Sequence, residues 1–583
     1  MYWGYLAGRK QLMVYVAFDH PVLNEGLSDG RIEQVKDWLL SWWGGEIPEE
    51  DGDTKYNLLF LAGVLHNLIC QDARLPLFDL PVIDAEGDKL ACWVPTLAGL
   101  DPKVHSLALS SALSAITKDT ESDCHEVLTR AVPEVQKRAG NKILGLSYGS
   151  IPILSEAHAM GFHFYHLSDD IVQVGQGSNS RLIHVSASDA DSAAGMLISE
   201  NKATMADVFH RAGIPTPVTI PATSPDVASF AFKKLPGPLI VKPERGARGQ
   251  GVQVGVTSVA LLKRAIALAI QSSPAKVALI QQQMTGDCHR VQILNGEVMW
   301  ASTRYPKSVV GDGSSTVAQL IDAANEALQD IAPRRRLRSF PSDELAIATV
   351  KEQGYAMGAV PPDGKRILLR PVTTVADGGD AEMITDTLHP ANAALCIEAA
   401  KVCRLNTAGI DFFSQDPTVP WFENGACILE VNYKPQIFNR LSDRITKDYQ
   451  KRFVTQLING AGNMPIYAFV GASPAKESAT QRHRELVAKG VSAWLYVDDG
   501  ISGPECAMRP LKSGDRLRDL QSLMYNPRVE ALCVQVGVWG GEKALPITHV
   551  TTVETCNGEG DESAAVSWDQ VADRLQTRIA TQV

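Results

Sequence analysis

The chain has 583 residues, of which 45% are hydrophobic and 21% charged, an ordinary composition for a globular protein of several domains. Its net charge of −11 argues against a nucleic-acid binder or a protein held on anionic membranes. The ten cysteines include no Cys-x-x-Cys pair, so we expect free thiols in the reducing cytoplasm. We expect neither a membrane span nor a signal peptide, because no run approaches about 20 apolar residues and the N-terminus lacks a leader pattern.

Residues 1–165 form the first expected domain, a mixture of short strands and helices. An apolar run predicts a strand at 14–18, and apolar residues at helical spacing predict helices at 31–43 and 103–116. Three histidines of this region are isolated along the sequence and are expected to be surface or core residues, not metal ligands: His66, His105 and His125.

A second expected domain, 166–460, has α/β texture. An amphipathic helix is predicted at 201–212, ended by Gly213, and apolar runs predict strands at 239–243 and 277–281. Further along, the dipeptide Asn295-Gly296 is a strong hairpin signal. The basic run Arg334–Arg338 could hold an anionic substrate, although a solvated loop is the simpler interpretation.

The strand at 239–243 leads into a basic, glycine-rich stretch before another strand. Its candidate phosphate-binding residues are Lys242, Gly246, Arg248, Gly249 and Gly251. Glycine lets backbone N–H groups approach phosphate oxygens closely, and a lysine at a strand end can reach them. The pattern is neither a Walker loop nor a dinucleotide fingerprint, and an ordinary glycine-rich hairpin remains the alternative.

A second constellation combines Asp411, at the end of one apolar run, with Glu430 and Asn432 in another. Residues two apart in a strand point to the same face, so Glu430 and Asn432 would project together. A buried carboxylate needs compensation, and a hard cation with oxygen ligands would supply it. The alternative is a strand edge with two solvated polar residues.

The order of these pieces, together with three longer segments, resembles the ATP-grasp superfamily and in particular the ATP-grasp domain of cyanophycin synthetase. That domain is also similar to the C-terminal domain of bifunctional glutathione synthetases. The matching segments are 289–321, which begins HRVQILNGEV; 386–413, which contains HPANAA and AGIDFF; and the strand ILEVN at 428–432.

The resemblance implies an α/β fold in which two domains grip ATP while Mg²⁺ bridges the phosphates. A carboxylate would be phosphorylated to an acylphosphate, and an amine would displace phosphate to form an amide. The same resemblance assigns a role to each site residue. The phosphates would be held by Lys202, Lys242 and the Gly246–Gly251 loop, which includes Arg248 and Gly249, and adenine would face Gln281 and Gln282. Mg²⁺ would be bound by Asp411, Glu430 and Asn432, and the acylphosphate would be stabilised by Arg290 and Arg370.

The chain departs from the family pattern near the expected substrate. Gln281 and Gln282 stand where the family has two acidic residues, and Cys288 replaces another. The segment after Arg370 lacks an arginine and an asparagine of the family pattern. We therefore expect amino-acid or short-peptide substrates other than the family's usual ones, and a non-catalytic nucleotide-binding scaffold is the alternative.

The third expected domain, 461–583, resembles a truncated Mur-ligase-like domain. Its loop at 471–478 includes Pro474 and Glu477 where the family has a phosphate-binding Gly-Lys-Thr segment. Proline lacks an N–H and glutamate would repel a triphosphate, so we expect this domain to be inactive. The resemblance also implies a homo-oligomer, either a dimer or a tetramer.

Overall fold

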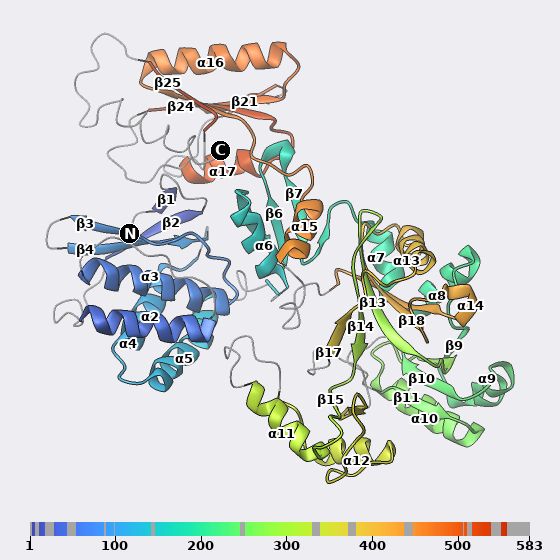
Figure 1. Cartoon of the computed structure of the whole chain (residues 1–583). Helices are drawn as coiled ribbons and strands as arrows, with labels where there is room; N and C mark the ends of the chain where they lie inside the picture. Colours follow the sequence, from blue (N-terminus) through green and yellow to red (C-terminus); the bar gives the residue numbers. More distant parts are fainter. Residues whose placement is uncertain are drawn as a thin grey trace. The chain divides into compact units, whose positions relative to one another are not determined.

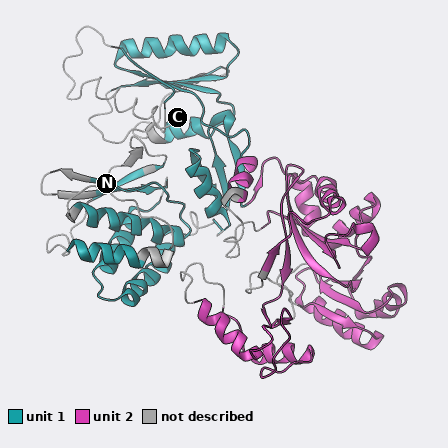
Figure 2. Cartoon of the chain, in the orientation of Figure 1, with its two compact units in different colours: residues 1–185, 458–583 teal, residues 186–457 magenta. Residues whose placement is uncertain are grey.

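The computed structural model divides into two compact units, residues 1–185 with 458–583 and residues 186–457 (Figure 2). It describes residues 3–5, 11–17, 28–43, 54–86, 89–97, 100–140, 146–147, 149–244, 251–328, 339–370, 380–435, 447–498, 500–504, 506–509, 516–537 and 550–556. Among these residues no helix is long and apolar enough to cross a bilayer. The predicted Arg334–Arg338 run lies outside the described residues.

The N-terminal part of the first unit combines a four-stranded antiparallel sheet with four helices. The sheet has the order β1-β2-β4-β3, and its members are β1 (Trp3–Tyr5), β2 (Leu12–Ala17), β3 (Val82–Glu86) and β4 (Lys89–Thr96). The helices are α2 (Asp29–Trp43), α3 (Thr54–Asp72), α4 (Pro102–Ile116) and α5 (Glu121–Ala139). The helices predicted at 31–43 and 103–116 are confirmed, and the predicted strand is β2.

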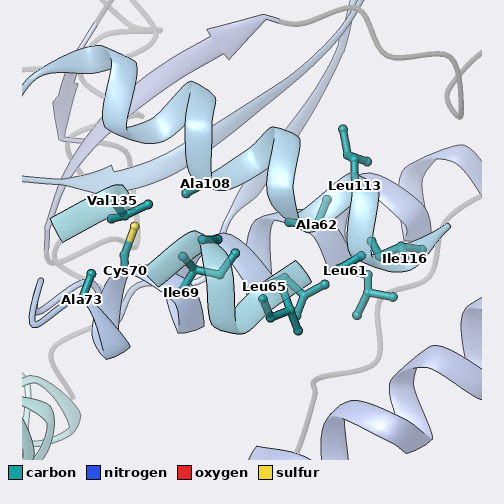
Figure 3. Close-up of a cluster of buried hydrophobic side chains, with 14 of the residues drawn as sticks. Leu61, Ala62, Leu65, Ile69, Cys70, Ala73, Ala108, Leu113, Ile116 and Val135 are labelled. Atoms are coloured by element: carbon teal, nitrogen blue, oxygen red, sulfur yellow. The ribbon is translucent and has the colours of Figure 1, made fainter. Parts of the chain in front are cut away.

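The core of this part lies among α3, α4 and α5, as the labelled side chains of Figure 3 show. Two of the isolated histidines are buried beside it, and Nε2 of His66 lies 2.9 Å from Nδ1 of His105. Thr96 closes the chain of contacts, with its Oγ1 2.8 Å from Nε2 of His105. Both are therefore hydrogen-bonded core residues, as predicted.

A short antiparallel sheet packs on the C-terminal part of the same unit. Helix α6 (Ser150–Ala159) precedes strands β5 (Phe164–Ser168), β6 (Ile171–Val174) and β7 (Arg181–His184). Gln173 donates a hydrogen bond of 2.9 Å to the carbonyl of Met524, and the rings of Tyr165 and Tyr525 meet edge to face. Residues 166–185, which we assigned to the second domain, thus lie in the first compact unit; the three-domain division remains a prediction.

The C-terminal part is a mixed sheet of order β23-β22-β21-β24-β20-β25. Strands β20 (Ile466–Val470), β21 (Ala493–Val497), β24 (Ala531–Val536) and β25 (Thr552–Thr555) run parallel, and β22 (Gly500–Gly503) and β23 (Cys506–Arg509) are antiparallel. The helices are α16 (Ser473–Ala488) and α17 (Arg516–Met524). Helix α16 contains Pro474 in its first turn and begins almost directly after β20.

The second unit contains two antiparallel sheets of four or more strands, each covered by helices on one face (Figure 1). The smaller sheet has the order β11-β10-β12-β9, made of β9 (Thr219–Ala222), β10 (Leu239–Pro243), β11 (Gln253–Val256) and β12 (Ala278–Gln282). Helices α9 (Ala228–Lys234) and α10 (Val259–Ser272) cover one face of this sheet. The predicted strands at 239–243 and 277–281 are β10 and β12.

The larger sheet has the order β17-β14-β13-β18-β19. Its strands are β13 (Asp287–Leu294), β14 (Glu297–Tyr305), β17 (Asp380–Met383), β18 (Thr407–Ser414) and β19 (Cys427–Tyr433). The apolar side chains of one face pack against α8 (Lys202–Ala212) and α13 (Pro390–Val402). Because strand residues alternate, the polar residues between them project from the opposite face.

The remaining elements lie around these two sheets. A small lobe, inserted between β14 and β17, has its own core. It contains β15 (Ser308–Val310), α11 (Val317–Ala327), α12 (Glu344–Glu352) and β16 (Arg366–Leu368). The other short elements of this unit are β8 (Ala187–Ser188), α7 (Ala193–Glu200), α14 (Trp421–Asn424) and α15 (Lys447–Leu457).

Candidate active site

The three predicted metal ligands come together on the open face of the larger sheet. Asp411 of β18 is the direct cross-strand partner of Glu430 of β19. Asn432 follows on the same face of β19, and its Nδ2 lies 3.4 Å from Oδ2 of Asp411 and 3.2 Å from the carbonyl oxygen of Gly409. β19 is an edge strand of the sheet, as the alternative expected, and all three side chains are partly buried, so the metal site remains a prediction.

Two arginines from the hairpin β13–β14 face this acidic pair. Nε of Arg290 lies 2.8 Å from Oδ1 of Asp411, which is its partner in the strand register. Nη1 of Arg304 lies 3.8 Å from the same oxygen, so two guanidinium groups share one carboxylate. Burial together with the charge of Arg290 lowers the pKa of Arg304 to about 10. Because the two partly desolvated arginines share a single carboxylate, one positive charge is left unpaired, and a further anion would bind favourably here.

A glycine makes room for the guanidinium of Arg290. A Cβ atom at Gly409 would collide with Nη1 of Arg290 and would lie 2.7 Å from Cβ of Pro435. Gly409 is two residues before Asp411 in β18 and therefore lies on the same face of the sheet. The sequence Gly-Ile-Asp thus places the carboxylate and the space for its arginine partner together.

Two lysines complete the cationic part of the site. Lys202 is the first residue of α8, whose N-terminus is capped by the side chain of Asn201, and its Nζ lies 3.0 Å from Oε1 of Glu430. Lys242 projects from β10 of the smaller sheet. Burial lowers its pKa to about 8, while the charges of Glu430 and Lys202 act on it in opposite directions. Both lysines are therefore placed near the acidic pair.

The two predicted adenine-facing residues lie on opposite faces of the smaller sheet. Gln281 is 4% exposed and lies directly across from Ile240, two residues along β10 from Lys242. Alternation puts Gln281 and Lys242 on one face. Gln282 lies opposite Leu239, whose side chain packs toward α10, and only Gln281 shares the face of Lys242.

The glycine-rich loop is described only at its end. Gly246, Arg248 and Gly249 lie outside the described residues. Gly251 has a φ of +72°, and a Cβ there would lie 2.7 Å from Cβ of Ser272. This backbone conformation and close approach explain the glycine at position 251.

Arg370 is placed apart from the other candidates. Its guanidinium makes a bidentate pair with Asp343, at 2.7 and 3.0 Å, in the lobe formed by α11 and α12. Asp343 also caps the N-terminus of α12. Within the described residues no ion pair or hydrogen bond joins Arg370 to Asp411, Glu430 or Asn432, so its predicted role at the acylphosphate remains a prediction.

Sequence reasoning missed Arg304, although it named Cys288 as a departure near the expected substrate. Arg304 is the cross-strand partner of Cys288, which lies on the same face as Arg290. Burial and the nearby charge of Asp411 raise the pKa of the Cys288 thiol to about 12, so the thiol stays neutral. The hairpin signal at Asn295-Gly296 marked both strands, but the register that brings Arg304 to this face is set by a bulge between Gln292 and Ile293.

The donor atoms of the site fit Mg²⁺. Oδ1 of Asp411 is ion-paired with Arg290 and Arg304, and the two carboxylates and an amide oxygen are ligands that hard cations prefer. Among the described residues there is no cluster of three or more His, Cys, Asp or Glu side chains suited to a metal. A metal here would therefore rely on Asp411, Glu430 and Asn432, with water or phosphate oxygens completing its shell.

The chain is 30% identical over 316 residues to the cyanophycin synthetase of Geminocystis herdmanii, in an alignment that covers 53% of this chain and 35% of that protein. Another cyanophycin synthetase, from Synechocystis sp., matches with the same identity and coverage. Over about half its length, the chain is cyanophycin synthetase-like. The aligned part spans about a third of these relatives.

The chain is also 28% identical over 254 residues to the bifunctional glutathione biosynthesis protein of Mannheimia succiniciproducens, in an alignment that covers 42% of this chain and 33% of that protein. The structure of a bifunctional glutathione synthetase from Pasteurella multocida is similar with a TM-score of 0.41 at 19% identity, over 61% of this chain and 52% of that one. No protein-family model matches the chain.

Proposed function

We propose that the chain is an ATP-dependent carboxylate–amine ligase that joins an amino acid to the carboxylate of an amino acid or short peptide. The observation that carries the proposal is the pairing of Asp411 with Glu430 on one face, surrounded by Lys202, Arg290 and Arg304. Four cations, counting Lys242, face two carboxylates, and this excess suits a polyphosphate ligand. The identity to cyanophycin synthetases supports the same conclusion.

In the proposed reaction a substrate carboxylate oxygen attacks the γ-phosphorus of ATP and ADP leaves. The amine nitrogen then attacks the acyl carbon, phosphate leaves, and the amine proton passes to solvent. Lys202 and Lys242 would bind phosphate oxygens, since both side chains are near the acidic pair. Mg²⁺, held by Asp411, Glu430 and Asn432, would neutralise charge on the transferred phosphoryl group.

Arg290 and Arg304 are the proposed stabilisers of the acylphosphate and of the tetrahedral intermediate. Both are held in place by Asp411, so their positive charge is fixed before the substrate arrives. Preorganised cations of this kind stabilise a developing oxyanion without reorganisation during the reaction. A covalent protein nucleophile is not required in this scheme.

The proposal is tested with a panel of amino acids and short peptides incubated with ATP and Mg²⁺, measuring ADP, phosphate and amide product. ADP with an amide supports the ligase, whereas AMP contradicts the acylphosphate route. Glu430→Ala should abolish turnover, and Lys476→Ala in α16 should leave it nearly unchanged. Equal losses in both variants would mean that the C-terminal domain carries a second working site.

The scaffold alternative is favoured by three replacements of the family's acidic residues. Gln281 and Gln282 are at the expected adenine site, and Cys288 is near the expected substrate. This alternative predicts nucleotide binding without turnover for every amine–carboxylate pair. We also propose that the Mur-like domain is an inactive packing platform, and that the protein is a cytoplasmic homo-oligomer. Light scattering on the purified chain measures the oligomeric state.

A further inference from the structure

Gln281 lies in a row of three residues that crosses the smaller sheet. Its cross-strand partners are Ile240 on β10 and Thr219 on β9. All three project from the same face as Lys242, because the residues on the other face pack against α9 and α10. The amide of Gln281 is therefore a nearly buried polar group on the face that also carries a phosphate-binding candidate.

The hydrogen bonds around Gln281 fix which way its amide points. The hydroxyl of Thr219 lies 3.0 Å from the carbonyl oxygen of Pro217 and 2.6 Å from Nε2 of Gln281. The single hydroxyl proton of Thr219 is donated to the carbonyl of Pro217. Thr219 Oγ1 then accepts from Nε2 of Gln281, so the NH₂ of the amide faces Thr219. The Oε1 oxygen of Gln281 has no partner among the described residues and is left as an acceptor.

Resting on the proposed use of ATP, we propose that Thr219 is a positioning residue that holds Gln281 as an acceptor and thereby selects adenine over guanine. The 6-amino group of adenine donates a hydrogen bond, whereas the 6-oxo group of guanine can only accept one. A carboxylate at this position would accept with either oxygen. An amide needs an orienting partner, because a flip would present its donor to guanine.

The cost of a wrong base follows from the same geometry. Accepting guanine would require the amide to turn, so that Oε1 would face Thr219 Oγ1 and the bond from Nε2 would be lost. The one hydroxyl proton could then serve either Oε1 or the Pro217 carbonyl, and the other buried acceptor would lose its partner. We therefore expect the wild-type protein to bind ATP about tenfold more tightly than GTP because of this contact.

The experiment measures binding of non-hydrolysable ATP and GTP analogues with Mg²⁺ to the full chain. Thr219→Val removes the hydroxyl at similar volume and should lower the ATP-to-GTP affinity ratio about tenfold, while Thr219→Ser should keep the wild-type ratio. In a Gln281→Glu background, Thr219→Val should no longer change the ratio, because a carboxylate needs no orientation. Thermal unfolding checks that each variant is folded.

The outcomes separate the inference from the proposed function. If the wild-type protein binds and turns over ATP but Thr219→Val leaves the ratio unchanged, only the role of Thr219 is overturned. Equal effects of Thr219→Val and Thr219→Ser would likewise overturn it, because they indicate packing and not the hydroxyl. A wild-type chain that binds neither nucleotide and forms no amide would overturn the proposed function and this inference together.

Discussion

Nζ of Lys202 lies 3.0 Å from Oε1 of Glu430, so a candidate phosphate ligand is paired with a candidate metal ligand. Asp411 is paired in the same way with Arg290. Each carboxylate that would face Mg²⁺ is neutralised by a protein cation. Binding of Mg·ATP would therefore exchange partners, with Lys202 moving to phosphate and Glu430 to the metal.

This exchange predicts that metal and nucleotide bind cooperatively. Without nucleotide, Lys202→Met should bind Mn²⁺, used as a probe for Mg²⁺, more tightly than the wild type, because Glu430 loses its competing cation. The same variant should bind ATP about tenfold more weakly, for loss of one charge-assisted contact. Mn²⁺ binding is followed by electron paramagnetic resonance. Lys263→Met, on the exposed face of α10, is the control, and equal behaviour of both variants would contradict the exchange.

The lowered pKa of Lys242 predicts a pH dependence of nucleotide binding. With a pKa of about 8, caused mainly by burial, the ammonium is charged below pH 8 and loses its proton as the pH rises through it. Phosphate favours the charged form, so ATP binding without metal should weaken above pH 8 and should take up a proton at pH 8.5. Lys242→Arg should flatten this dependence. Calorimetry in two buffers of different ionisation enthalpy measures the proton, and a wild-type chain without uptake would refute the assignment.

Gly409 should be far more sensitive to a methyl group than an open glycine. Gly409→Ala would push the guanidinium of Arg290 from its place beside Asp411. We expect turnover to fall on the order of 100-fold, as for loss of one preorganised stabiliser. The control is Gly358→Ala, where nothing lies within 4 Å of the new Cβ. Similar rates in the two variants, each checked for folding by its Tm, would argue against a catalytic Arg290.

The buried pair His66 and His105 predicts loss of stability in mild acid. Burial lowers the pKa of His66 to about 4, and the pKa of His105 falls well below its usual value, so the unfolded chain binds protons that the folded one does not. Stability should therefore fall with pH from about 6.5 toward 4, by roughly 3 kcal/mol for His66. Urea unfolding at pH 7.5 and 5 measures this, and His66→Gln should have the shallower slope. If the free energy of unfolding changed equally with pH in the wild type and in His66→Gln, other titratable groups would be the cause of the acid sensitivity.

Much of the site was predictable because its chemistry is local in sequence. Glu430 and Asn432 share a face through simple alternation, and Asp411 ends a recognisable apolar run. Arg304 was not predictable in this way. Counting outward from the Asn295-Gly296 turn pairs it with Asp287, on the opposite face, and only the bulge after Gln292 moves it beside Cys288.

The positions of Arg370 and of strands β5–β7 also differ from the sequence-based expectations, because they depend on tertiary packing. Arg370 pairs with Asp343, 27 residues earlier in the chain, and no local pattern in the sequence marks the two residues as partners. Strands β5–β7 lie in the first unit because they contact residues more than 300 positions away, such as Met524. Apolar patterns predict that such strands exist, but they do not specify which sheet the strands join.

In the proposed reaction a carboxylate becomes an acylphosphate in the site around Asp411 and Glu430. The most direct test supplies the substrate with ¹⁸O in its carboxylate, with ATP, Mg²⁺ and the amine, and analyses the phosphate by mass spectrometry. We expect ADP and one ¹⁸O transferred to phosphate for each amide formed, with no turnover in Glu430→Ala. Unlabelled phosphate, or AMP with pyrophosphate, would contradict it.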